Sequence, residues 1–176
     1  MLTGETVTGV KPLGGYIEIQ LKKHNIILGE DLILHYSPQN EKPSVRHQLL
    51  LEFDNGYKFA ATVKMFGALY VVPVGSYTVT HHQLAHEKPN PLTAAFTSTY
   101  FDSLAQNLRP AMSLKAFLAT EQRIPGLGNG VLQDILFNAG LNPENKIKQL
   151  SADQMHKLYD SIKTTLAVMT KLGGRN

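Results

Sequence analysis

Apolar residues follow two different periods along this chain, and the change predicts its architecture. Up to about Pro73 the pattern is strand-like, with alternation over 16–21 and short apolar runs at 32–35 and 47–53. Asp54-Asn55-Gly56 separates the last run from the β-rich stretch 57–63, and Asn-Gly between two such runs is a strong hairpin signal. These patterns predict an antiparallel sheet that forms part of a β-sandwich.

From about Phe96 the apolar positions recur at helical spacing, in the segments 96–108, 114–118, 131–139 and 155–172. Thr97 and Ser113 are candidate N-caps for the first two segments. Ser151 to Gln154 form a capping box, and Gly173-Gly174 ends the last segment. The fold class predicted is α+β, an N-terminal antiparallel β-sheet (partial β-sandwich) followed by a helical domain.

We expect three parts: a partial β-sandwich at 1–77, a linker at 78–95 and a helical domain at 96–176. The linker assignment rests on a histidine-rich, proline-containing stretch, 78–91. Its histidines, His81, His82 and His86, include an i, i+4 pair, but no carboxylate pattern completes a ligand set. We therefore expect no metal site in this chain.

Composition excludes several classes of chemistry. The chain has 176 residues, of which 43% are hydrophobic, enough to bury a core. Cysteine is absent, which removes disulfides, thiol catalysis and thiolate zinc sites. No stretch resembles a signal peptide or a membrane span, so a cytoplasmic location is expected.

The positive charge is uneven along the chain. Residues 1–90 carry eight Lys/Arg and eight Asp/Glu, whereas residues 91–176 carry nine and six. The whole net charge of +3 therefore belongs to the second half, which is where a polyanion would bind preferentially.

A compact glycine loop, with Gly126, Gly128 and Gly130, lies between two helical segments. A dinucleotide fingerprint needs a preceding strand and a third glycine one position later, and a P-loop needs Lys and Ser/Thr after the glycines. Both nucleotide interpretations fail. The spacing leaves two others open: a helix start, capped by Asn129, whose unpaired amides at 126–130 receive a DNA phosphate, or an ordinary helix corner with glycines for packing.

Specific residues around this loop resemble a known family. The stretch 115–174, with QRIPGLGNGVLQDILFNAGLNP at its centre and KLGG at its end, is similar to the helix–two-turns–helix module of the formamidopyrimidine-DNA glycosylase / endonuclease VIII family. More loosely, 32–36 and RHQLLLEFDNGYKFAATVKMFGALYV resemble the β-rich half of that family. The resemblance implies a base-excision-repair DNA glycosylase/AP lyase that binds double-stranded damaged or abasic DNA.

The family's catalytic groups have no counterpart in this sequence. Its chemistry uses an N-terminal Pro-Glu, in which a secondary amine attacks the sugar and a carboxylate moves protons. This chain begins Met1-Leu2, and Gly15 stands where the family has a catalytic lysine. We therefore expect no catalytic residue here, a catalytically incomplete chain, and no cofactor, since the family's zinc finger would lie beyond Asn176.

Several DNA-binding positions do carry over from the family. Gly126, Gly128 and Asn129 match the turn that grips phosphates, and Lys115 matches a basic position early in the preceding helix. Lys64 and Phe66 match a loop that fills the gap left by a flipped-out nucleotide. Lys in place of the family's Arg loses a planar hydrogen-bonding fork. Phe66 as a core residue and the two lysines as solvated charges are the alternative interpretations.

Arg123, just before the loop, is expected to pair with Asp134 or with a phosphate. A second function also remains open, a stand-alone, non-enzymatic nucleic-acid- or protein-binding module built on the same helical corner. An exposed sheet edge would in addition allow the chain to self-associate.

Overall fold

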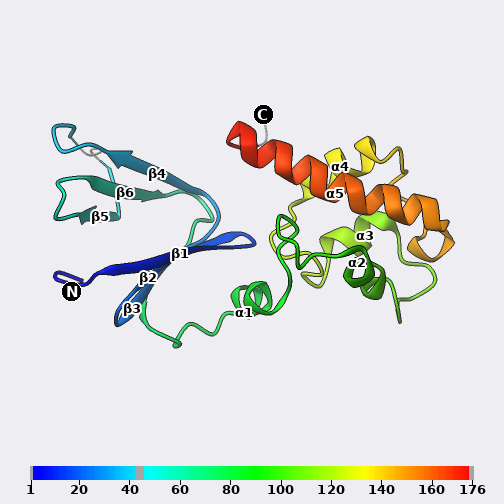
Figure 1. Ribbon diagram of the computed structural model, residues 1–176, viewed down its shortest axis with the longest axis horizontal. Helices are drawn as coiled ribbons and strands as arrows, with labels where there is room; N and C mark the ends of the chain where they lie inside the picture. The colour runs from blue at the N-terminus through cyan, green and yellow to red at the C-terminus, as the bar shows by residue number, and fades with distance from the viewer. Residues whose placement is uncertain (1, 43–45, 175–176) are drawn as a thin grey trace. The chain divides into compact units, whose positions relative to one another are not determined.

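The computed structural model describes residues 2–42 and 46–174 and divides between Thr78 and Val79 into two compact units (Figure 1). We call them the sheet unit and the helical unit. The predicted α+β class, with an antiparallel sheet followed by helices, is confirmed. Among the described residues, no helix is both long and apolar enough to cross a membrane.

The sheet unit consists of two antiparallel sheets, visible as two layers in Figure 1. One has the order β1-β2-β3-β7 and the other the order β4-β6-β5. The strands are β1 (Val7–Leu13), β2 (Tyr16–Leu21), β3 (His24–Leu28), β4 (Leu32–Ser37), β5 (Leu49–Glu52), β6 (Lys58–Val63) and β7 (Leu69–Pro73).

The sheet unit's core forms between the two sheets, as the alternating pattern requires. Ile19, Ile26 and Leu28 from the first sheet form one buried cluster with Ala61 from the second, and Phe59 packs against it. Successive side chains of a strand point to opposite faces, so Ile26 and Leu28 face this core whereas Ile27 points to the other face, where it is also buried.

The hairpin predicted at Asp54-Asn55-Gly56 is confirmed. It joins β5 to β6, Gly56 has φ +83°, and the Tyr57 amide donates to the Asn55 side chain over 3.0 Å. A left-handed residue at this position is what the glycine allows without steric cost.

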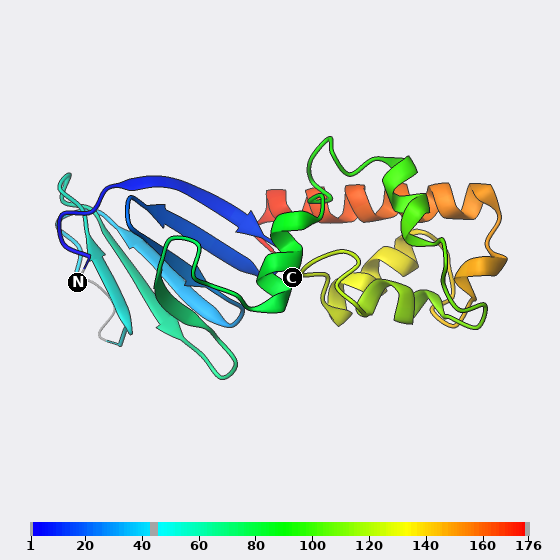
Figure 2. The same ribbon diagram turned by 90° about the horizontal axis from the view of Figure 1, so that it is seen from below.

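The helical unit consists of α1 (Thr80–Glu87), α2 (Ser98–Leu104), α3 (Leu114–Ala119), α4 (Asn129–Asn138), a 3₁₀ turn (Ile147–Gln149) and α5 (Ala152–Leu172). Figure 2 shows α5 running the length of this unit with α3 and α4 alongside. Thr97, Ser113 and Ser151 cap their helices as predicted, the last in a full capping box.

The segment 78–95, predicted as a linker, differs in the structure, because residues 80–87 form α1. Histidines and prolines favoured a break in the sequence, but Pro89 and Pro91 both lie beyond the C-cap, Lys88. Proline shortly after a helix end is common because it cannot continue the helix. The prolines therefore mark where α1 stops and do not exclude it.

The helical unit's core is rich in aromatic rings. Phe101 and Phe117 are completely buried and meet edge to face with centroids 5.8 Å apart, and the Tyr159 hydroxyl donates to the Phe96 carbonyl over 2.9 Å. Leucines and isoleucines of α4 and α5 complete the cluster.

We expect Phe117→Ala to lower the free energy of unfolding of the helical unit by about 3–5 kcal/mol, because it removes a buried ring and leaves a cavity. Urea denaturation followed by circular dichroism measures the loss. Phe137→Ala is the matched control: its ring is 85% exposed, so the change should stay within about 0.5 kcal/mol. Equal losses in the two variants would contradict this assignment of the core.

Candidate nucleic-acid interface

The turn between α3 and α4 begins with two residues in left-handed conformation, Glu121 (φ 59°) and Gln122 (φ 45°). This conformation is unfavourable for residues other than glycine and persists only when the surroundings impose it. The Glu121 carboxylate pairs with Arg123, and the Gln122 side chain accepts from the Gly126 amide over 3.1 Å. Both side chains are therefore used inside the turn.

The Arg123 side chain is buried at the C-terminal end of α3. Nη1 donates to the carbonyls of Phe117 (3.3 Å) and Thr120 (3.0 Å), and Nη2 lies 2.6 Å from a carboxylate oxygen of Glu121. The last carbonyls of a helix lack intrahelical partners and carry a partial negative charge, which a guanidinium satisfies. Glu121 and the end of α3 are thus partners of Arg123 that the sequence did not predict.

Lys88 is a second cation at the turn, and no sequence pattern predicted it. Its ammonium donates to the carbonyls of Gln122 (2.6 Å) and Glu121 (3.3 Å). Burial, followed by the nearby charge of Arg123, lowers the pKa of the Lys88 ammonium below its ordinary value. Because 34 residues separate Lys88 from Gln122, and Lys88 lies in the predicted linker, no local pattern points to this contact.

The amides that lack a partner are not those predicted. The Gly126 amide is bonded to Gln122 and the Leu127 amide to the Ile124 carbonyl (3.2 Å), and the first bond of the helical ladder runs from Leu132 to Gly128. Within the described part of the chain, the amides of residues 128–131 have no acceptor. The predicted range 126–130 is therefore corrected to 128–131.

The predicted cap is also wrong. Gly128 is the N-cap of α4 and makes no side-chain cap bond, whereas Asn129 is the first helical residue. Its side chain is exposed and forms no hydrogen bond among residues that the structure describes. Asn129 therefore keeps its side-chain donor and acceptor for another molecule.

Gly126 and Gly128 differ in backbone conformation. Gly126 has φ +77°, so the backbone itself favours glycine there. Gly128 has an ordinary φ of −79°, and a Cβ at this position would meet nothing within 4 Å. Neither backbone conformation nor packing within the chain accounts for glycine at 128, so the packing interpretation fails at this residue.

Lys115 is not brought to this turn. It occupies the first turn of α3, the opposite end from residues 120–128, and its amide donates to the Pro143 carbonyl. Its side chain is exposed. The helix is about 9 Å long at 1.5 Å per residue, so Lys115 belongs to a neighbouring patch of the helical unit.

Lys64 and Phe66 lie in the sheet unit, in a tight turn after β6. The Gly67 amide donates to the Lys64 carbonyl, the Lys64 amide donates to the Asp31 carbonyl, and a Cβ at Gly67 would lie 2.6 Å from that Asp31 oxygen. This fixed turn leaves Met65 86% and Phe66 79% exposed. The interpretation of Phe66 as a core residue is therefore wrong, and Met65 is an exposed neighbour that the sequence analysis missed.

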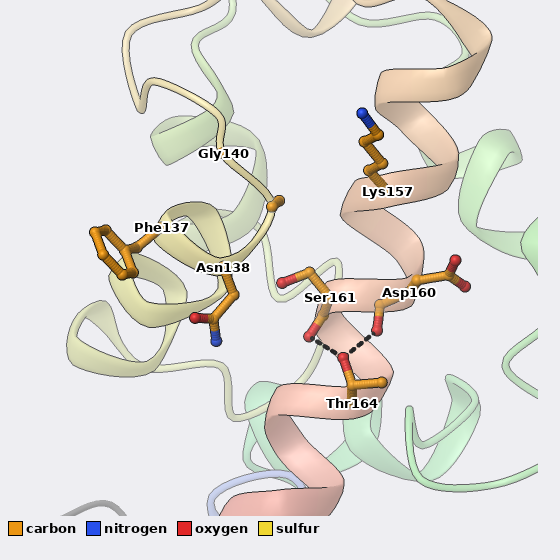
Figure 3. Close-up of a pocket in the computed structure, with 8 residues that line it drawn as sticks. Phe137, Asn138, Gly140, Lys157, Asp160, Ser161 and Thr164 are labelled. Carbon is orange, nitrogen blue, oxygen red and sulfur yellow. Dashed lines mark hydrogen bonds between the residues drawn. The ribbon is translucent and has the colours of Figure 1, made fainter.

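A shallow pocket of about 520 Å³ lies between the end of α4 and the middle of α5 (Figure 3). Three of its polar side chains form hydrogen bonds within the unit: Thr164 donates to the Asp160 carbonyl, Ser161 to the Ile135 carbonyl, and Asn138 to Thr165. The pocket is at the C-terminal end of α4, away from the unpaired amides, and we do not assign it to the interface.

Comparison with known proteins shows which family this chain resembles. The family model described as the formamidopyrimidine-DNA glycosylase H2TH domain matches residues 88–176. Proteins named formamidopyrimidine-DNA glycosylase from Bacillus cereus (26% identity over 180 residues) and Xanthomonas euvesicatoria (30% over 178) each match 99% of this chain. The chain spans 63% and 64% of the length of these two curated relatives.

The fold is similar to that of a solved structure, the Lactococcus lactis formamidopyrimidine-DNA glycosylase bound non-covalently to DNA containing an AP site. The TM-score is 0.75 at 23% identity, covering 98% of this chain and 66% of that one. At this identity the likeness shows the fold.

We expect Arg123→Met to lower the free energy of unfolding of the helical unit by about 2–3 kcal/mol, because several hydrogen bonds from one charged group are lost. Arg123→Lys should lower the free energy of unfolding by less, because an ammonium keeps the charge. Some loss should remain, since lysine lacks the planar fork of the guanidinium. Urea titration measures both. Arg109→Met, at an exposed position, is the control, and a loss equal to that control would show that Arg123 does not hold the turn.

Proposed function

Because the chain belongs to the formamidopyrimidine-DNA glycosylase H2TH family, we propose that it is the DNA-binding portion of a base-excision-repair DNA glycosylase/AP lyase. Its partner is duplex DNA that contains a damaged or abasic nucleotide. The observation that carries the proposal is the exposed start of α4, where four consecutive amides lack an acceptor within the described residues and Gly128 leaves space in front of them.

The start of α4 suits a phosphate for electrostatic reasons. Aligned peptide dipoles place a partial positive charge at the N-terminus of a helix, and the unpaired N–H groups point along the axis toward an anion. Lys88 and Arg123 lie behind the preceding turn. A backbone phosphate of DNA supplies the negative charge that this end of the helix favours and the oxygen acceptors that the unpaired amides lack.

Glycine at 128 sets how closely that phosphate can approach. With no side chain at this position, the phosphate oxygens reach hydrogen-bonding distance of the amides without displacing protein atoms. The exposed Asn129 side chain supplies one further donor beside them. This contact binds the sugar-phosphate backbone of DNA and therefore confers no preference for a base sequence.

The turn of Lys64 to Gly67 suits a damaged site. An exposed aromatic side chain on a fixed turn can enter the gap left by an extruded nucleotide and offset the loss of base stacking. The adjacent Lys64 ammonium is exposed and provides a cation for nearby phosphates.

We expect Gly128→Ala to weaken binding of abasic duplex DNA by about tenfold, the loss of one charge-assisted hydrogen bond, while the melting temperature stays unchanged. The added methyl group meets only open space in the protein, so stability and affinity should separate. Fluorescence anisotropy and thermal denaturation measure the two quantities. Gln106→Ala, an exposed polar change away from the turn, is the control. If Gly128→Ala binds abasic duplex as tightly as the parent chain, no phosphate contacts the amides at this position.

We expect Asn129→Ala to weaken duplex binding by about tenfold, because one hydrogen bond to a phosphate is lost. The slope of log K against log salt should stay unchanged, since a neutral amide neutralises no phosphate and releases no counterion. The measurement is a salt titration of binding to one duplex. If the affinity matches that of the parent chain, Asn129 is not a contact, and the alternative of a protein-binding corner gains support.

We expect Phe66→Ala to reduce affinity for abasic duplex more than for the matching undamaged duplex, by about tenfold in the ratio, because only the damaged duplex offers a gap. Phe137→Ala, a similarly exposed phenylalanine in the helical unit, should leave the ratio unchanged. Equal losses on both duplexes would contradict a gap-filling role for Phe66.

A further inference from the structure

The chain contains two Asn-Gly pairs, Asn55-Gly56 and Asn129-Gly130. Asparagine is a thermolabile residue, and a glycine after it makes loss of the side-chain amide easier. The reason is steric: glycine has no Cβ to hinder its own backbone nitrogen from approaching the preceding side chain. The two pairs differ in how their reacting groups are held, so we expect them to differ in reactivity.

The hairpin between β5 and β6 restrains the reacting groups of the first pair. The Gly56 amide donates to the Phe53 carbonyl over 2.9 Å, and the Asn55 side-chain oxygen accepts from the Tyr57 amide over 3.0 Å. The nitrogen that would attack is therefore engaged in a hydrogen bond, and the side chain that it would attack is fixed on the next amide along the chain. We expect this pair to react slowly.

The second pair has neither restraint. The Gly130 amide belongs to the unpaired group 128–131, and the exposed Asn129 side chain forms no hydrogen bond within the described part of the chain. Asn129 is the first residue of α4. The rotation that brings the Gly130 nitrogen to the Asn129 side-chain carbon therefore disturbs only the first turn of the helix, and helix ends fray.

We propose that Asn129 is a site of spontaneous deamidation, and that its conversion to aspartate or isoaspartate weakens the phosphate contact at the start of α4. The first half of this inference stands on the contrast between the two Asn-Gly pairs. The second half rests on the proposed function, because it concerns the DNA phosphate expected at these amides.

The reaction needs water and no other reactant. The Gly130 nitrogen loses its proton and forms a bond to Cγ of Asn129, while the bond from Cγ to Nδ2 breaks and the side-chain nitrogen leaves as ammonia. The product is a cyclic succinimide. One water molecule then opens the ring at either carbonyl, which gives aspartate or isoaspartate. In sum, a neutral amide and water become a carboxylate and an ammonium ion.

The new carboxylate would compete with DNA for the same amides. A negative side chain in the first turn of a helix interacts favourably with the helix dipole, so the converted chain should remain folded. The same charge repels an approaching phosphate, and the donor of the Asn129 side chain is lost. Conversion should therefore reduce affinity for DNA without loss of structure.

Peptide mapping by mass spectrometry tests the modification site. During incubation of the parent chain at mildly alkaline pH, Asn129 should deamidate about tenfold faster than Asn55, whose pair must first break two hydrogen bonds. In urea the two sites should react at similar rates, because the fold no longer distinguishes them. Equal rates in the folded chain, or a faster reaction at Asn55, would overturn the proposal.

Gly130→Ala is the matched variant for the same measurement. Position 130 is helical, so the backbone accepts alanine, and the added Cβ hinders the attacking nitrogen. Deamidation at Asn129 should slow markedly, whereas the rate at Asn55 should stay that of the parent chain. Circular dichroism confirms that the variant is folded. An unchanged rate at Asn129 would contradict the succinimide route.

Asn129→Asp tests the consequence for DNA. It should bind abasic duplex roughly a hundredfold more weakly than the parent chain, against about tenfold for Asn129→Ala, because repulsion is added to the lost hydrogen bond. The difference between the two variants should shrink as salt rises, since salt screens the repulsion. Its melting temperature should equal or exceed that of the parent chain.

Gln106→Asp is the charge-matched control at an exposed position away from the turn. If Asn129→Asp binds abasic duplex as tightly as this control, the second half of the proposal is wrong. Saturating abasic duplex should also slow deamidation at Asn129 and leave Asn55 unaffected, because a bound phosphate occupies the Gly130 amide. If the parent chain binds no duplex, the proposed function fails, whereas the difference in rate between the two Asn-Gly pairs still supports the modification site.

Discussion

The candidate interface depends on one buried guanidinium. Arg123 closes the C-terminal end of α3, and Lys88 holds the next two carbonyls, so that the backbone enters left-handed conformation at two consecutive residues other than glycine. That unfavourable geometry reverses the chain and starts α4 with its amides uncovered. The turn therefore obtains its shape from charges inside the protein, and its outer surface remains available for an anion.

The glycines of this turn show how a residue type can be read only after its backbone angle is known. In the sequence, Gly126 and Gly128 look equivalent. In the structure, the first satisfies a positive φ, whereas the second has neither a conformational nor a packing reason within its unit. A glycine without an internal cause is the observation on which the proposed phosphate contact rests, and it is more specific than the number of glycines in the turn.

The sequence correctly predicted the features that depend on local patterns, namely helix caps and a hairpin. The helix caps at Thr97, Ser113 and Ser151 and the hairpin at Asn55-Gly56 were predicted correctly, because each depends on a few adjacent residues. Features set by distant contacts were not predicted: Lys88 on the Gln122 carbonyl and the exposure of Met65 beside Phe66. Asn129 as the cap was wrong by one residue, since the choice between it and Gly128 is made by the preceding turn.

The contact between Lys88 and the turn also bears on modularity. All residues that form the turn lie between 120 and 131, yet one of the two cations that hold it comes from just after α1. A fragment that started downstream of Lys88 would retain the complete motif and lose part of its support. The smallest self-sufficient version of this helical corner must therefore include the end of α1, a boundary that agrees with the start of the family match at residue 88.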